Sequence, residues 1–223
     1  MLTEWVDGAR RAREILALQL KNAPTQPTAI FQRSNSGWMV SITPPEAAVS
    51  LSWRMGPGDF ASTGYFATPD SRTGKPMPNP TFELPPNAAA GLIEVRYEDA
   101  SGRAQGPFPI AFDPRVELMR GQRAVLEQFA NSWVSFGGGS GRSDLLFYTQ
   151  IMSFRCAVAR AELGNGDAAP SIVLPMPPCD ERNPHAIPAD ARPYVTVAAN
   201  VRSVSVRLFW ADGGQSAVKV FSR

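Results

Sequence analysis

Three side chains carry the chemistry of a thiol-based reaction: Cys156 and Cys179, the only two cysteines, and His185, the only histidine. A cysteine becomes a strong nucleophile when an imidazole beside it takes its proton. Cys179 and His185 lie in one proline-rich segment, close enough along the chain to approach each other. A thiol hydrolase that uses this pair is therefore one function to test. The residues around Cys179 match no local signature of a cysteine-hydrolase family, and no third group is fixed beside the pair.

The same two cysteines could instead form a disulfide. A bond between Cys156 and Cys179 would close a loop of about 24 residues and stabilise the fold by roughly 3 kcal/mol in the chain-entropy model. It requires an oxidising compartment. Residues 1–21 are interrupted by charges and contain no signal-peptide core, so we expect a cytoplasmic protein if Met1 is the native start. If the sequence is a fragment of a longer chain, we expect a periplasmic or extracellular one.

Other catalytic chemistry finds little support. In the glycine-rich run 137–143, Phe136 stands where a phosphate loop has its first glycine, and Arg142 stands where it has its lysine. One histidine and two cysteines do not make a zinc tetrad, and the acidic residues show no calcium-loop spacing. We expect no metal, no cofactor and no enzymatic activity.

Three aromatic residues are the best candidates for a binding surface. Phe60, Tyr65 and Phe66 lie in the glycine-rich stretch 56–66, where a loop is expected to expose them. Exposed loop aromatics are used by protein-binding domains and by carbohydrate-binding ones. The long proline-rich segment 175–188 is a second expected loop, and we predict that it also faces a partner.

The N-terminal residues have the one clear helical period. Trp5 and Leu16 belong to an apolar stripe within residues 3–21, and Pro24 ends it. This helix could pack on the protein's own first β unit or dock on a partner, so Trp5 and Leu16 are further candidate binding residues. An anchor contact with a membrane surface is a weaker alternative, because acidic residues are mixed with the basic ones.

A set of landmarks occurs twice along the chain, with a separation that grows as loop insertions would require. The landmarks of the first half are the run 51–54 (LSWR), Asn79-Pro80, residues 93–97 and Phe112, and those of the second half are 152–155 (MSFR), Asn183-Pro184, residues 204–208 and Phe221. Two copies of one small β unit would produce this pattern. Arg54 and Arg155 occupy matching places, as do Arg96 and Arg207, and arginines on alternating strand positions normally face solvent.

Short alternating strands separated by turns fill both copies, among them 28–33 and 91–98 in the first copy and 151–160 in the second. About seven strands in each predict two tandem β-sandwiches, over residues 28–115 and 132–223, which resemble the immunoglobulin-like or fibronectin-III-like architecture. The cysteine–tryptophan–cysteine framework of immunoglobulin domains is absent from the first copy, which has no cysteine. A short connecting helix is expected within 116–131, and residues 1–27 form the N-terminal helix and linker. The fold class is all-β.

These observations favour a non-enzymatic protein-interaction module, an accessory subunit of a larger bacterial assembly. A net charge of +2 excludes the basic footprint of a nucleic-acid binder. No apolar run approaches 18 residues, so we expect no membrane span. A carbohydrate-binding β-sandwich module and the thiol hydrolase with Cys179 and His185 are the two alternatives.

Overall fold

The computed structural model describes residues 25–34, 36–71, 74–138 and 143–223. The predicted N-terminal helix, with Trp5 and Leu16, lies outside the described residues. The chain divides into two compact units, the first built mainly from Met39–Leu84 and Ala90–Phe112 and the second mainly from Asp113–Arg223. Antiparallel sheets with few helices make up both, which confirms the prediction of a β-rich, all-β fold at that level.

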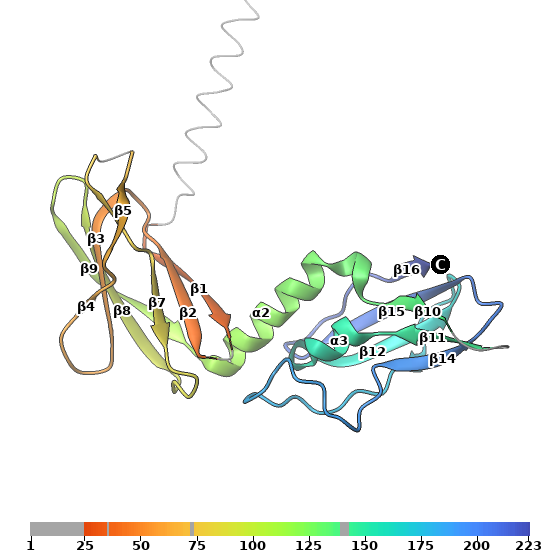
Figure 1. Ribbon diagram of the computed structural model, residues 1–223. Coiled ribbons are helices and arrows are strands. Elements are labelled where there is room, and N and C mark those ends of the chain that lie inside the picture. Colours follow the sequence, from red (N-terminus) through yellow and green to blue (C-terminus); the bar gives the residue numbers. More distant parts are fainter. Residues whose placement is uncertain (1–24, 35, 72–73, 139–142) are drawn as a thin grey trace, which may run out of the picture. The chain divides into compact units, whose positions relative to one another are not determined.

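Unit 1 contains two sheets and a separate hairpin (Figure 1). Three strands form one sheet in the order β1-β2-β7, four form the other in the order β4-β3-β8-β9, and β5 pairs with β6 alone. The strands are β1 Thr28–Arg33, β2 Trp38–Thr43, β3 Ala48–Met55, β4 Ala61–Ser62, β5 Tyr65–Pro69, β6 Pro76–Pro78, β7 Thr81–Leu84, β8 Gly91–Asp99 and β9 Ala104–Phe112.

The alternation of apolar and polar residues explains which face of each strand is buried. In β8, Ile93, Val95 and Tyr97 are buried, whereas Glu94 between them is partly exposed and Arg96 is exposed, because successive side chains point to opposite faces. Phe31 of β1 packs on Phe112 of β9 with ring centroids 5.1 Å apart. Side chains from both sheets therefore share one core.

Unit 2 also contains two sheets, in the orders β10-β11-β14 and β13-β12-β15-β16. Leu146 and Val197 of the first sheet and Val206 and Leu208 of the second lie in one buried apolar cluster. The strands are β10 Ser135–Gly137, β11 Ser143–Phe147, β12 Val158–Asn165, β13 Ile172–Val173, β14 Tyr194–Ala198, β15 Ser203–Trp210 and β16 Lys219–Ser222.

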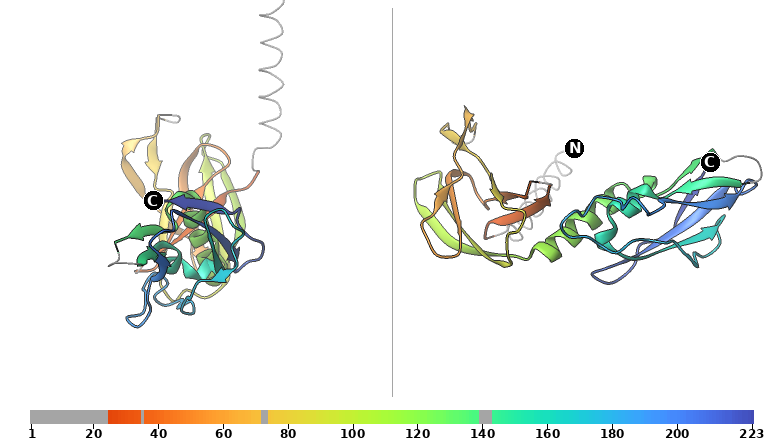
Figure 2. Two further views of the ribbon diagram at one scale, coloured as in Figure 1. Left: turned by 90° about the vertical axis from the view of Figure 1, so that its right-hand side faces the viewer. Right: turned by 60° about the horizontal axis from the view of Figure 1, so that its bottom comes forward.

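The two units have the same strand order once the β5–β6 hairpin is set aside. In each, the first, second and fifth strands form one sheet, and the fourth, third, sixth and seventh form the other. The two layers within each unit can be followed from other directions in Figure 2. Apart from that hairpin, the described parts of the two units thus share one topology.

The helix α2, Pro114–Gln128, belongs to unit 2. Asp113 caps its N-terminus by accepting from the backbone N–H groups of Arg115 and Val116, and Pro114 suits the first turn because no intrahelical partner is needed there. Leu126 is fully buried in the unit 2 core. The connecting helix was predicted within 116–131, and the observed helix begins and ends a few residues earlier. It packs as part of unit 2. The short helix η1, Ala130–Ser132, follows it.

The predicted strand over 151–160 is wrong for residues 151–157. The chain there forms a short helix, α3 (Thr149–Ser153), then a single turn, η2 (Arg155–Ala157), and strand β12 begins only at Val158. Ile151 and Met152 are adjacent and both buried, which a helix inside a core permits and a two-faced strand does not. Within the described ranges, no helix is long and apolar enough to cross a membrane.

Candidate binding sites

The β5–β6 hairpin has one strand, β5, that is exposed along its whole length. Tyr65 pairs with Pro78 and Pro69 with Pro76, and the N–H of Asn79 donates to the carbonyl of Gly64 at 2.9 Å to close its base. All five residues of β5 are exposed. A two-stranded ribbon is marginal in isolation, so its prolines matter because they restrict the backbone in the unbound state.

Tyr65 and Phe66 are the large apolar side chains of this hairpin. Tyr65 is 55% exposed and Phe66 is 46% exposed. Neighbouring residues of a strand project to opposite faces, so the two rings do not form one flat platform. The hairpin instead presents an apolar group on each side.

Phe60 is in a different environment from these two. It is half-buried beneath two guanidinium groups, that of Arg96 at 3.9 Å and that of Arg54 at 4.6 Å from the ring centroid. Arg54 is itself fixed by Glu94, with Nε 2.6 Å from the carboxylate, and by the carbonyl of Gly58 at 3.0 Å. Phe60 therefore packs locally on its own sheet rather than projecting as the neighbouring hairpin does.

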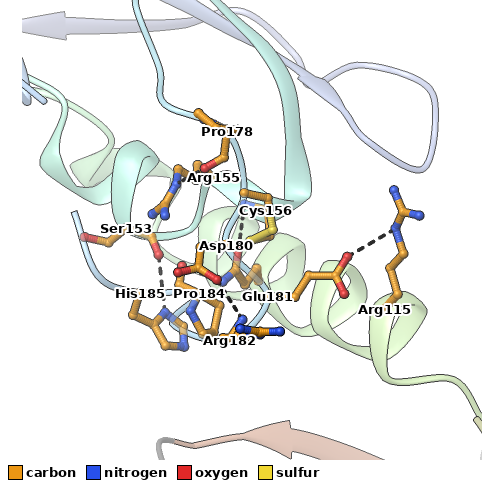
Figure 3. The surroundings of a disulfide bond; sticks show 12 residues. Arg115, Ser153, Arg155, Cys156, Pro178, Asp180, Glu181, Arg182, Pro184 and His185 are labelled. Carbon is orange, nitrogen blue, oxygen red and sulfur yellow. Dashed lines mark hydrogen bonds and ion pairs between the residues drawn. A yellow bond between two sulfur atoms is a disulfide. The ribbon is translucent and has the colours of Figure 1, made fainter. Parts of the chain in front are cut away.

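In unit 2, a disulfide joins Cys156 and Cys179 (Figure 3). Cys156 is buried in η2, whereas Cys179 is exposed in the proline-rich loop of residues 174–193. The bond connects positions 23 residues apart. With its sulfur bonded to Cys156, Cys179 has no free thiol to pair with His185.

Arg155 binds the same loop through a hydrogen bond from its buried side chain. Its Nε donates to the carbonyl of Pro178 at 2.9 Å and its Nη1 to the carbonyl of Met152 at 3.2 Å, and the side chain is only 3% exposed. The expectation that Arg155 faces solvent from a strand is wrong, because it lies in a helical turn covered by the loop. The N–H of Arg182 is the main cause that lowers the pKa of Asp180 in this loop, with a further contribution from the charge of Arg155.

Gln122 of α2 supplies another link to the loop. Its side-chain oxygen accepts from the N–H of Cys156 at 2.9 Å, and its nitrogen donates to the carbonyl of Pro184 at 3.4 Å. Gln122 is buried, so both groups need protein partners. The helix, the disulfide turn and the loop thus form one connected polar framework.

His185 packs against the short helical segment. Its Nδ1 lies 3.3 Å from the carbonyl oxygen of Ser153, and its ring meets Phe154 edge-on with centroids 5.3 Å apart. These contacts give the histidine a structural place in the loop.

A pocket of about 400 Å³ lies beside the disulfide. Apolar side chains of α2 and the loop line it, among them Leu118, Met119 and Met176, and Arg115 and Glu181 form an ion pair there at 3.5 Å. Cys156 and Cys179 also line the pocket, and their sulfur atoms are bonded to each other. In the part of the chain that the structure describes, no three His, Cys, Asp or Glu side chains lie together as metal ligands.

No protein-family model matches the chain, and no curated protein matches it either.

The residues that hold the loop were not found by sequence reasoning. Gln122 reads as one polar position of an amphipathic helix, and Arg155 as a strand arginine. Their partners are backbone groups, most of them distant along the chain, which leave no signal in residue type or spacing. The glycine-rich run lies largely outside the described residues, since only its ends, in β10 and β11, belong to them.

Proposed function

We propose that this protein is a non-enzymatic interaction module of a larger bacterial assembly and that the β5–β6 hairpin inserts into its protein partner. The observation that carries the proposal is the exposure of Tyr65 and Phe66 on a strand whose residues are all exposed. Aromatic side chains dominate the free energy of protein interfaces. A hairpin apolar on both sides suits a groove in a partner better than a flat surface.

The same geometry favours a protein over a carbohydrate. Sugar rings stack on flat aromatic faces, and Tyr65 and Phe66 point to opposite sides of their strand. A groove of another protein can contact both at once. The prolines of β6 reduce the conformational entropy that the hairpin loses on binding.

We propose further that each unit is a β-sandwich of the fibronectin-III-like kind. The shared order, three strands in one layer and four in the other, supports this architecture. The disulfide supports an oxidising compartment as the place where the protein works. It also speaks against the thiol-hydrolase alternative, because Cys179 would first have to be reduced.

The test is affinity capture of the partner from the native host with tagged protein. The double variant Tyr65→Ser/Phe66→Ser should recover at least tenfold less partner than the wild type, because both apolar contacts are lost. Ile30→Ser is the matched control, since Ile30 of β1 is 63% exposed on the same unit but outside the hairpin. Circular dichroism should show that both variants are folded. A double variant that recovers as much partner as Ile30→Ser would refute the hairpin as the binding element.

A further inference from the structure

The outer face of the four-stranded sheet of unit 1 carries a cluster of two arginines, one glutamate and one phenylalanine. Arg54 of β3 lies directly opposite Glu94 of β8, and Arg96 lies two positions further along β8. Both guanidinium groups lie over the ring of Phe60. Glu94 pairs with Arg54 at 2.6 Å. We call these four residues the unit 1 cluster.

The corresponding sheet of unit 2 also carries two arginines, one glutamate and one phenylalanine. Arg160 of β12 lies opposite Phe209 of β15, with its guanidinium 4.1 Å from the ring centroid, and Glu162 lies opposite Arg207. Glu162 pairs with Arg160 at 3.1 Å. These four residues are the unit 2 cluster. It lies on the third and sixth strands of its unit, the strands that also carry the unit 1 cluster, apart from Phe60 in the β3–β4 loop.

Each cluster has one positive charge that its glutamate does not neutralise. Among the described residues, no carboxylate forms an ion pair with Arg96 or Arg207. Arg96 is exposed, and its guanidinium lies over the Phe60 ring, a contact that limits its motion while its N–H groups stay available. Such an ordered guanidinium loses little entropy when it binds a planar anion in two hydrogen bonds. In the unit 2 cluster the ring contact is made by Arg160 and not by Arg207.

Exposed apolar surface adjoins both clusters. In unit 1, Leu92 is 59% exposed and, with Met55, Pro109 and Glu94, lines a hollow of about 480 Å³. In unit 2, Val173 is 55% exposed and lies opposite Glu162, on the far side from Arg207. In both units the glutamate lies between the uncompensated arginine and the exposed apolar side chain. The matching ligand therefore has a negative charge and an apolar group a few residues apart.

We propose that each cluster binds a carboxylate of an acidic polypeptide segment whose neighbouring apolar side chain packs on Leu92 or Val173. This deepens the proposed interaction function and rests on it. One uncompensated charge in each unit matches a single side-chain carboxylate. Nucleic acids are bound through many phosphate contacts and need a larger basic surface. Arg96 and Arg207 are the residues that recognise the anion.

The test is a titration of the full chain with an eight-residue peptide that is blocked at both ends. Binding is measured from the changes in the backbone amide chemical shifts in NMR spectra. The peptide contains two glutamates and two leucines in a Gly-Ser background. A second peptide has glutamine at the glutamate positions, and a third has phosphoserine there. The glutamate peptide should shift amides around Arg96 and Arg207, with at least tenfold weaker binding by the glutamine peptide. Raising the salt concentration should weaken binding, because exposed charges are screened.

Variants locate the two sites separately. Arg96→Gln should abolish the response in unit 1 alone, and Arg207→Gln the response in unit 2 alone. Arg202→Gln is the control, since Arg202 is exposed and outside both clusters, and it should bind as the wild type does. Equal binding of the glutamate and glutamine peptides, or responses that neither substitution removes, would overturn the proposal. If the phosphoserine peptide binds tenfold more tightly than the glutamate peptide, the sites recognise a phosphoryl group and not a carboxylate, which would also overturn the proposal.

The outcome is independent of the hairpin. If Tyr65→Ser/Phe66→Ser keeps the native partner while the glutamate peptide still binds, the hairpin proposal fails and the carboxylate sites stand. If the hairpin variant loses the partner while the peptides do not discriminate charge, only the carboxylate sites fail.

Discussion

Gln122 and Cys156 are joined by a buried hydrogen bond of 2.9 Å, from the backbone N–H of the cysteine to the side-chain oxygen of the glutamine. This bond connects helix α2 to the turn that carries the disulfide. The other end of the same amide donates to the loop at Pro184. One side chain therefore satisfies two backbone groups from segments far apart in the sequence.

Replacing Gln122 should destabilise unit 2 strongly. In Gln122→Ala, the N–H of Cys156 and the carbonyl of Pro184 lose their partner, and a cavity forms. We expect the free energy of unfolding to fall by about 2–3 kcal/mol, since each buried unpaired group costs roughly 1–3 kcal/mol. Urea unfolding measures this. Gln128→Ala, at an exposed position of the same helix, should change it by less than about 0.5 kcal/mol. Equal effects of the two substitutions would show that the buried amide has no special role.

The disulfide should be a major source of stability. Cys156→Ser/Cys179→Ser should unfold at lower urea concentration than the wild type, with a loss of roughly 3 kcal/mol, because the closed loop restricts the unfolded chain. Reducing the wild type with a phosphine should have the same effect. The double serine variant should not respond to the phosphine, which serves as the control. A wild-type midpoint that reductant leaves unchanged would contradict this role.

Asp99 should make the stability of unit 1 depend on pH in the acid range. Its buried carboxylate accepts from the hydroxyl and N–H of Ser101, from the N–H and Nε of Arg103, and from Gln105. These bonds, the Ser101 hydroxyl first among them, hold the pKa of Asp99 well below its ordinary range. The unfolded chain then binds the proton more readily than the folded one, so this contribution to stability is fully present above about pH 4 and is lost as the pH falls further.

Thermal unfolding between pH 6 and pH 2 tests this dependence. Asp99→Asn should melt below the wild type at pH 6, and the difference in melting temperature should shrink as the pH falls. Asp190→Asn, at an exposed loop position, serves as the control for a lost surface carboxylate. A difference between Asp99→Asn and the wild type that stays constant over the whole range would rule out titration of Asp99 as its cause.

Most strands of unit 1 could be predicted, because one face of each strand is buried and the other faces water. β1 has the predicted bounds, 28–33, and β8 ends one residue beyond its predicted range of 91–98. The prediction for the segment 151–160 was less accurate because its first residues do not alternate between a buried and an exposed face. The segment is apolar on neighbouring positions, and a short apolar run does not distinguish a buried strand from a buried helix.

The internal repeat was predicted correctly at some landmarks and wrongly at others. Residues 93–97 lie in β8 and residues 204–208 in β15, and these two strands are equivalent. Phe112 is the last residue of β9 and Phe221 lies in β16, which are also equivalent strands. The run 51–54 lies in β3, whereas 152–155 lies in α3 and η2, and the true counterpart of β3 is β12. Asn183-Pro184 lies in the proline-rich loop and not in β14. Inserted segments move short residue matches away from the strands they are compared with.

The sequence by itself determined that strands would predominate, because the alternation of apolar and polar residues along the chain follows the two faces of a strand. It also limited the reactive side chains to two cysteines and one histidine. Only the tertiary structure decided their roles, since a disulfide and a Cys179–His185 pair both need the sulfur of Cys179 and differ in the partner that this sulfur meets. The two arginine clusters depend on it as well, because cross-strand register sets Arg54 opposite Glu94 and Glu162 opposite Arg207.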